Sequence, residues 1–306
     1  MHSIREEHTM HSIREEHTMS QSIKYLRPRT RTEAIEMLAR PGYQAAPFIV
    51  HPKPTALRQM GVDALVDLSL LGLNTIQETQ DGTIHIGALA TLQEMMVNPI
   101  LSIGTRGLLS QAAGLAAGPG IRNLSGLWGA IQARSGPPEV LLALLVLEAQ
   151  VVLLEAGEKQ CTLSFPEFYS MGPNSLHKGA LVLESALPPL ATSCGWALER
   201  VARTPRDEAI VAAAAVVEVE DGKTKRVSLA LAGANPLPRR IPTVETDLLE
   251  KAFDAQTLQA AAETVREQSD PASDFRGSSE YRRSMAGLVA RRALEKAWEQ
   301  ASGRRI

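Results

Sequence analysis

The chain has 306 residues, of which 44% are hydrophobic and 22% are charged, and this composition is typical of a globular protein with a sizeable core. Its 32 Lys and Arg residues nearly balance 34 Asp and Glu residues, so the net charge of -2 gives no electrostatic reason to expect a nucleic-acid partner. Apolar runs such as residues 140–147 are much shorter than the ~20 residues that span a bilayer, so we expect no membrane partner. The length predicts about two domains.

The cysteines and the N-terminus indicate the compartment in which the chain works. Cys161 and Cys194 lie far apart in the sequence and form no CxxC pair, which predicts no zinc or iron–sulfur site on this chain. Free thiols and a charged N-terminus without a signal-like apolar stretch favour a reducing, cytoplasmic location. Residues 2–10 (HSIREEHTM) are repeated as residues 11–19, and we expect residues 1–21 to form a tail outside the fold.

Residues 22–190 predict a first domain in which short strands and helices follow one another. In chain order, we expect strands within 23–28, 47–50, 63–71, 75–78, 83–88, 148–154, 160–163 and 180–185, and helices within 32–42, 92–97, 107–117, 137–147 and 165–169. Asp81-Gly82 is a strong hairpin signal, because both residues tolerate the positive φ of a two-residue turn. Thr91 is placed to cap the helix that follows it.

The stretch from Gly118 to Glu139 (GPGIRNLSGLWGAIQARSGPPE) contains five glycines and three prolines. In a helix interior, glycine costs roughly 0.5–1 kcal/mol relative to alanine and proline about 3 kcal/mol. We therefore predict a long irregular loop held between two packed helices. Ordered loops of this length usually carry a function, and glycine lets a backbone approach a ligand closely.

Residues 193–300 predict a second domain made of a small sheet and helices. We expect strands within 195–203, 209–220 and 225–233, and helices within 245–253, 257–267 and 275–298. Asp221-Gly222 joins the last two strands as a second hairpin.

The closing helix is expected to begin at a serine cap, Ser278 or Ser279. Its predicted buried face is formed by Tyr281, Met285, Leu288 and Val289. We expect Arg282 and Arg283 to fix domain packing, and the scattered histidines His51, His85 and His177 to be structural or exposed.

Three segments resemble the FAD-binding medium subunit of molybdenum hydroxylases, the xanthine and carbon monoxide dehydrogenase family. Residues 121–139 (IRNLSGLWGAIQARSGPPE) are similar to the family's second flavin loop, which reads IRN, then G-T-I-G-G-N, and then reaches an acidic position. Residues 275–298 (FRGSSEYRRSMAGLVARRALEKAW) are close to the family pattern R-x-S-x-x-Y-R with L-V-x-R-A-L after it. Residues 84–91 (IHIGALAT) resemble the family's I-G-A-x-x-T. The resemblance covers about residues 23–299.

This resemblance implies an α+β fold. It implies a PCMH-type FAD-binding domain of two α/β subdomains over residues 22–190, and a CO dehydrogenase flavoprotein C-terminal-like domain, a small antiparallel sheet plus helices, over residues 193–300. It also implies an oxidoreductase subunit with no catalytic residue and no metal ligand of its own. The cofactor would be FAD, which takes electrons from a 2Fe–2S small subunit and passes them to NAD+ or another acceptor, while a molybdopterin-binding large subunit oxidises the substrate.

The resemblance carries the family's cofactor positions onto particular residues of this sequence. They are His51, Pro52, Lys53, Pro54, Thr55, Ala56, Thr91, Gly126, Leu127, Trp128, Gly129, Ala130 and Glu139. Glu139 stands at the acidic position near the flavin ring, and Arg200 and Arg203 match basic positions of a strand in the second domain.

Both flavin loops depart from the family pattern. HPKPTA at residues 51–56 replaces A-G-G-T-D-L, and its two prolines lack the N–H groups that cradle a pyrophosphate. Trp128 replaces a glycine, and its side chain is large enough to fill a flavin pocket. One alternative is therefore a flavin-free paralogue that keeps the fold and the docking surface. Another is a self-contained oxidase of the vanillyl-alcohol type, which is disfavoured because the chain has no long substrate-cap region.

Overall fold

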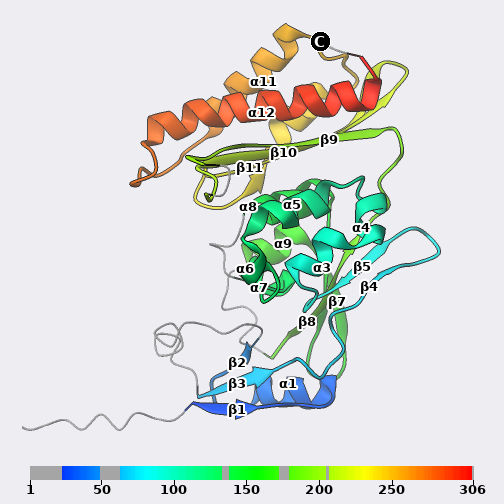
Figure 1. Cartoon of the computed structure of the whole chain (residues 1–306), viewed down its shortest axis with the longest axis vertical. Helices are drawn as coiled ribbons and strands as arrows, with labels where there is room; N and C mark the ends of the chain where they lie inside the picture. The colour runs from blue at the N-terminus through cyan, green and yellow to red at the C-terminus, as the bar shows by residue number, and fades with distance from the viewer. Residues whose placement is uncertain (1–22, 49–62, 133–137, 172–178, 205–206, 305–306) are drawn as a thin grey trace, which may run out of the picture.

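The computed structural model describes residues 23–48, 63–132, 138–171, 179–204 and 207–304. The predicted tail and the predicted cofactor residues His51 to Ala56 lie outside this part. The molecule is elongated, and three sheets follow one another along its long axis, with α1 at one end and α12 near the other (Figure 1). We call them the N-terminal, middle and C-terminal sheets.

The N-terminal sheet is parallel, has the order β1-β3-β2 and packs against a single helix. Its elements are β1 (Lys24–Leu26), α1 (Arg31–Ala39), β2 (Ala45–Phe48) and β3 (Ala64–Asp67). Thr30 caps α1 by accepting a hydrogen bond from the Glu33 amide, and Ala34, Ile35 and Leu38 form its buried face.

The middle sheet is antiparallel and has the order β4-β5-β8-β6-β7. Its strands are β4 (Ile76–Glu78), β5 (Ile84–Gly87), β6 (Gln150–Leu154), β7 (Gln160–Ser164) and β8 (Leu181–Leu187). The helices of this part are α3 (Leu92–Val97), α4 (Pro99–Gly104), α5 (Leu108–Ala116), α6 (Pro119–Arg122), α7 (Leu127–Gln132), α8 (Pro138–Val146) and α9 (Phe165–Ser170). The sequence did not predict α4, whose cap is Asn98 and whose first residue is a proline.

The expectation of an irregular loop from Gly118 to Glu139 was wrong in part. Two short helices, α6 and α7, form within this stretch in spite of its glycines. In α7 the buried side chains of Leu127, Trp128 and Ile131 face the core. Burial of three large apolar side chains outweighs the cost of one glycine in a short helix.

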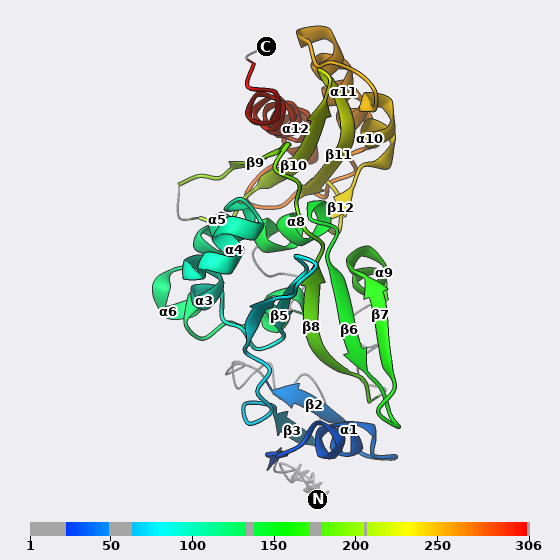
Figure 2. The same ribbon diagram turned by 90° about the vertical axis from the view of Figure 1, so that its right-hand side faces the viewer.

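The C-terminal sheet is antiparallel, has the order β12-β11-β10-β9 and is covered on both faces (Figure 2). Its elements are β9 (Cys194–Val201), β10 (Val211–Glu220), β11 (Lys223–Ala232), β12 (Arg239–Arg240), α10 (Pro242–Leu248), α11 (Ala255–Gln268) and α12 (Ser279–Ser302). The predicted α+β class is confirmed, and every strand and helix predicted within the described residues is present with shifted ends.

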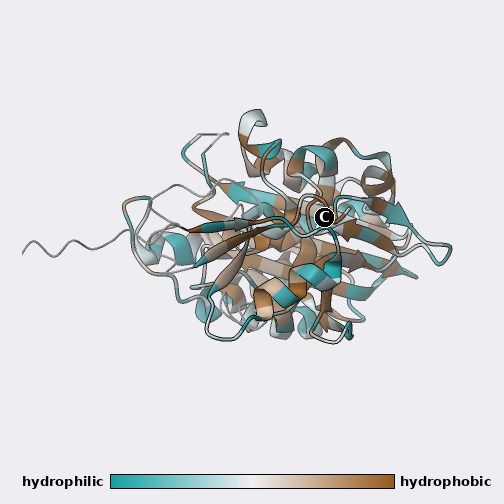
Figure 3. Cartoon of the chain, turned by 90° about the horizontal axis from the view of Figure 1, so that it is seen from below, coloured by the Kyte–Doolittle hydropathy of each residue, from teal (hydrophilic) through white to brown (hydrophobic). Residues whose placement is uncertain are grey.

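Alternate residues of β10 face different cores. Ala212, Ala214 and Val216 belong to the core that contains α8, whereas Ala213 and Ala215 belong to the core that contains α12. This two-residue period explains why β10 is apolar along most of its length: both of its faces are buried. Figure 3 shows the same distribution, with hydrophobic residues concentrated on the central strands and hydrophilic residues on the outer surfaces of helices and on loops.

The buried face of α12 differs from the prediction. Ser278 caps the helix as expected, but Tyr281 is exposed and Met285 is only half-buried. Val289 is buried as predicted, and the rest of the buried face consists of Arg282, Ala286, Gly287, Ala290, Ala293, Leu294, Ala297 and Trp298. Most of these side chains are small, which lets the helix lie close to the sheet and to α11. Arg282 donates to the carbonyl oxygen of Ile210 at 2.7 Å and so fixes packing, as predicted.

Among the described residues, no helix combines the length and the apolar content that crossing a membrane requires.

Candidate functional site

Two predicted cofactor segments meet in the middle part of the molecule. Thr91 and Gly126 form an isolated antiparallel bridge. The amide of Leu127 donates to the carbonyl oxygen of Ala90 at 2.8 Å, and the amide of Trp128 donates to that of Ala88 at 3.0 Å. We call this arrangement of residues 88–91 and 125–128 the crossing. The structure thus brings together Thr91 and the beginning of the predicted second flavin loop.

Gly126 lies against the other backbone segment of the crossing. A Cβ atom there would lie 3.4 Å from the carbonyl oxygens of both Ala88 and Leu89. The two backbones therefore pack closely at this point. The amides of Leu127 and Trp128 are used within the protein, and they do not provide the phosphate cradle that consecutive free amides would form.

Thr91 caps α3 as the sequence predicts. Its hydroxyl accepts from the amide of Glu94 at 3.1 Å, and the Glu94 carboxylate accepts from the Thr91 amide at 2.8 Å. This capping box saturates the hydrogen-bonding groups of Thr91 and fixes the start of α3 beside the crossing.

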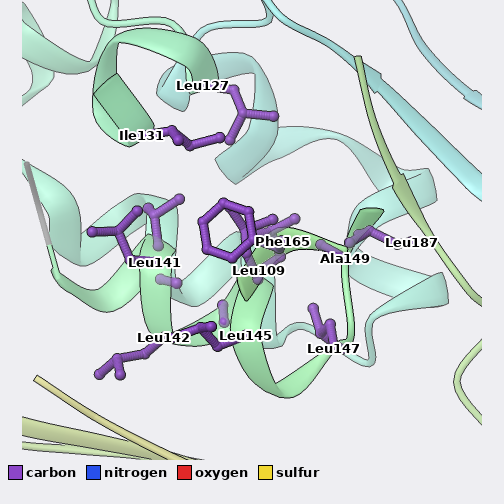
Figure 4. Close-up of a cluster of buried hydrophobic side chains, with 14 of the residues drawn as sticks. Leu109, Leu127, Ile131, Leu141, Leu142, Leu145, Leu147, Ala149, Phe165 and Leu187 are labelled. Carbon is purple, nitrogen blue, oxygen red and sulfur yellow. The ribbon is translucent and has the colours of Figure 1, made fainter. Parts of the chain in front are cut away.

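Trp128, whose side chain is large enough to fill a flavin pocket, is a core residue. The side chain is 3% exposed and packs against Phe168, with 5.4 Å between the ring centroids. Its neighbours in α7, Leu127 and Ile131, point into the same core beside Phe165 (Figure 4). The large ring, at a position where the family has glycine, is packed in this core.

Glu139 and Arg200 form a buried ion pair between two parts of the molecule. Glu139 lies in the first turn of α8 and is 2% exposed, while Arg200 lies on β9 of the C-terminal sheet. The Oε1 atom of Glu139 is 3.3 Å from Nη1 of Arg200. Glu139 Oε1 and Arg200 Nε are both buried without a hydrogen-bond partner in the described part of the chain. Buried polar atoms in this state are costly until a partner reaches them.

The surroundings of Glu139 raise the pKa of its carboxyl group. Burial raises the pKa of its carboxyl, and the charge of Glu208 raises it further, while the backbone amide and Arg200 act in the opposite direction. Burial is the largest of these causes, so the pKa lies above its ordinary value. The α7 helix, which begins directly after Gly126, packs against α8, so the pair and the crossing belong to neighbouring elements.

The sequence paired Arg203 with Arg200, and the structure separates their roles. Arg203 is exposed and lies 3.9 Å from Asp207, whereas Arg200 is half-buried and donates to the backbone carbonyl of Asp207. Glu208 was not predicted from the sequence; it pairs with Arg276 at 2.9 Å, and its charge raises the pKa of Glu139. The acidic pair in TPRDEAIV, directly after a predicted strand, was the available signal.

The remaining predicted cofactor residues are less informative. Gly129 and Ala130 continue α7, and His51 to Ala56 lie outside the described residues. Among the described residues, no group of three or more His, Cys, Asp or Glu side chains is arranged to hold a metal ion.

Two family models match the chain. The FAD binding domain in molybdopterin dehydrogenase matches residues 21–190, more than half of the chain, and the CO dehydrogenase flavoprotein C-terminal domain matches residues 196–297. This chain belongs to the family of FAD-binding medium subunits of molybdenum hydroxylases. The resemblance of residues 121–139 and 275–298 to that family is therefore confirmed.

Two curated relatives are similar in sequence to this chain over most of their length. The carbon monoxide dehydrogenase medium chain of Hydrogenophaga pseudoflava is 27% identical over 285 residues, covering 91% of this chain and 98% of the relative. The 6-hydroxypseudooxynicotine dehydrogenase complex subunit alpha of Paenarthrobacter nicotinovorans is 30% identical over 240 residues, covering 78% and 80%.

Solved structures show the same fold. A chain of carbon monoxide dehydrogenase from Hydrogenophaga pseudoflava superposes with a TM-score of 0.80 at 28% identity, covering 91% of this chain and 98% of that one. Quinoline 2-oxidoreductase from Pseudomonas putida 86 gives a TM-score of 0.80 at 23% identity, covering 92% of this chain and 98% of that one. At this identity, the match shows a similarity of fold alone.

Proposed function

We propose that this chain binds FAD and transfers electrons as the medium subunit of a molybdenum hydroxylase-type complex. The observation that carries the proposal is the Glu139–Arg200 pair, whose Oε1 and Nε atoms lack hydrogen-bond partners in the described part of the chain. One edge of a flavin ring presents an imide N–H between two carbonyl oxygens. A carboxylate oxygen accepts from such an N–H, and a guanidinium donates to such carbonyls, so the pair fits this group.

When it is bound, FAD supplies the redox chemistry, and the protein's part is to bind, orient and tune it. Arg200 keeps a positive charge at the site. Because burial raises the pKa of Glu139, its carboxyl retains a proton to a higher pH than an exposed glutamate does and can donate as well as accept. Trp128 packs in the core, so its ring leaves the cofactor space open.

The pyrophosphate of FAD needs donors other than the crossing, because the amides of Leu127 and Trp128 already donate to protein carbonyls. We assign this part to residues 51–56, where Lys53 offers a positive charge in place of the amides that the two prolines remove.

The partners follow from the relatives. The carbon monoxide dehydrogenase relative is named a medium chain, and the relative from Paenarthrobacter nicotinovorans is named a subunit of a dehydrogenase complex. We propose that this chain takes electrons from a 2Fe–2S small subunit, works beside a molybdopterin-binding large subunit, and passes the electrons to NAD+ or another acceptor.

A flavin-free paralogue is the second candidate, and a specific observation favours it. The first flavin loop has two prolines, and the second has its Leu127 and Trp128 amides occupied, so both lack donors for a pyrophosphate. In this case the chain would keep the fold and the docking surface and would serve as a structural subunit.

The visible absorption of the purified chain and calorimetric titration with FAD distinguish the two candidates. We expect one FAD per chain, and we expect both Glu139→Leu and Arg200→Gln to weaken FAD binding about tenfold, the effect of losing one charged hydrogen bond. Arg203→Gln, an exposed arginine near the same strand, is the matched control and should bind FAD normally. A folded, colourless chain that takes up no added FAD would establish the flavin-free candidate instead.

A further inference from the structure

A cavity of about 350 Å³ is lined by residues of α8, α9 and β12 and of the segment before β12. These elements lie where the middle part meets the C-terminal part (Figure 2). Leu145 of α8, with Pro166 and Tyr169 of α9, forms one side, and residues 235–240 form the other. Its size is in the range of small-molecule sites, which often lie between domains. Leu145 is in the last turn of α8 and Glu139 is in the first, so the cavity is at the opposite end of this helix from the proposed flavin site.

The walls of the cavity suit a flat apolar group. Tyr169 is 6% exposed, and its ring stacks on that of Phe165 with a centroid distance of 5.7 Å and an interplanar angle of 18°. This stacking holds the tyrosine ring in one orientation. Leu145 and Leu237 add aliphatic surface, and prolines on both sides add rigid apolar surface. A planar ring system is the shape that such walls bury well.

The polar groups of the cavity are mainly donors. The Oδ1 atom of Asn235 accepts from the Asp270 amide at 3.4 Å, which fixes the orientation of the side-chain amide. Its Nδ2 atom is buried without an acceptor in the described part of the chain. Of the residues that the structure describes, no Asp or Glu lines the cavity. The unmet need of the site is therefore an acceptor oxygen.

The two arginines of the lining differ in charge balance. Arg240 is neutralised by Glu245 at 2.8 Å and Glu148 at 3.0 Å. Arg239 is exposed, donates to the backbone carbonyl of Gln268 at 2.9 Å, and makes no ion pair within the described residues. One cation with unused donors thus remains at the edge of the cavity.

We propose that this cavity binds a small aromatic carboxylate. The ring lies between Tyr169 and Leu237, and the carboxylate accepts from Arg239 and from Asn235 Nδ2. Such a ligand contacts both parts of the molecule and stabilises their junction, since it binds the folded chain and not the unfolded one. The proposal does not depend on whether the chain binds flavin.

Calorimetric titration of the full chain with 1-naphthoate tests the proposal. We expect saturable binding, with affinity about tenfold lower for Arg239→Gln and within about threefold of the original for Arg239→Lys, because a charged hydrogen bond is lost only in the first variant. Arg29→Gln, which changes an arginine beside the N-terminal sheet, is the matched control and should bind like the original chain. The neutral 1-naphthylmethanol should bind about tenfold more weakly than 1-naphthoate.

Two further variants locate the ligand. Asn235→Ala should weaken 1-naphthoate binding, and Leu237→Asp should abolish it by placing a like charge on the wall, with thermal unfolding used to verify that both variants fold. No binding of 1-naphthoate at millimolar concentration would overturn the proposal. Equal binding of the neutral alcohol, or binding that Arg239→Gln and Asn235→Ala leave unchanged, would overturn it as well. FAD uptake is measured separately, so failure of the flavin proposal and failure of this one are distinguishable.

Discussion

The C-terminal sheet and the crossing are built in opposite ways. The sheet has β9 to β12 in antiparallel register, with one irregularity between Glu218 and Val219, and a packed core on each face. The crossing depends on one isolated bridge and a few backbone hydrogen bonds, and it is anchored by the side chains of the short helix α7. Regular elements distribute their stability over many equivalent contacts, whereas the crossing concentrates it on a few residues.

This difference predicts which substitutions should lower the stability of each region. In the crossing, a large anchoring side chain should be the sensitive feature, and the exposed glycines around it should be tolerant. In the C-terminal sheet, the sensitive feature should be the close approach of α12, where added atoms have no space. Four predictions test this contrast, in order of expected effect.

Trp128→Ala should reduce the free energy of unfolding by about 4 kcal/mol, because it leaves a cavity in the core against Phe168. Trp128→Phe should lose much less. Denaturant unfolding with an unchanged slope measures both. We also expect Trp128→Ala to leave FAD affinity no higher than before. A gain in affinity without loss of stability would place the ring in the cofactor space and contradict its assignment to the core.

Gly195→Ala should cost about 3 kcal/mol, since the new Cβ would lie 2.1 Å from the carbonyl oxygen of Ala297 and 2.5 Å from the amide nitrogen of Ala301, so α12 must move. Gly118→Ala is the matched control in the central stretch, because no atom lies within 4 Å of the added Cβ. If thermal unfolding showed equal losses for the two variants, the contrast between the regions would not hold.

Glu139→Gln should change how stability depends on pH. Burial raises the pKa of Glu139 in the folded chain above its ordinary value of 4.5. Between pH 4.5 and this raised pKa, the folded chain holds a proton that the unfolded chain has lost. The free energy of unfolding of the original chain should therefore fall as pH rises from 4.5 through the folded pKa, and the variant should lack this fall. Unfolding curves measured at a series of pH values give the difference between the two chains. Parallel curves would mean that burial does not control this carboxyl.

Glu148→Ala should have the smallest effect, about 0.5–1 kcal/mol, because the glutamate is 42% exposed although it pairs with Arg226 and Arg240 at 3.0 Å each. The backbone of Glu148 has a φ of +56°, which glycine adopts without strain. Glu148→Gly should therefore lose less stability than Glu148→Ala in the same unfolding assay. The reverse order would indicate that the backbone strain is not relieved there.

Local signals in the sequence were sufficient for much of the fold. Asp221-Gly222 predicted a hairpin, and both residues have the positive φ that such a turn needs. Thr91 and Ser278 were expected to cap helices and do so. These features depend on neighbours within a few residues, so the sequence alone can specify them. The apolar run within residues 209–220 likewise predicted a strand, which is β10.

The tertiary structure decided what depends on distant neighbours. Whether Trp128 lies in a cleft or in the core depends on Phe168 and on how α7 meets α9. The pairing of Glu139 with Arg200 needs α8 and β9 to meet, and the buried face of α12 is set by how closely the helix approaches the sheet. Hydropathy along a helix shows which residues favour burial, but the space left by the opposing surface determines which of them fit.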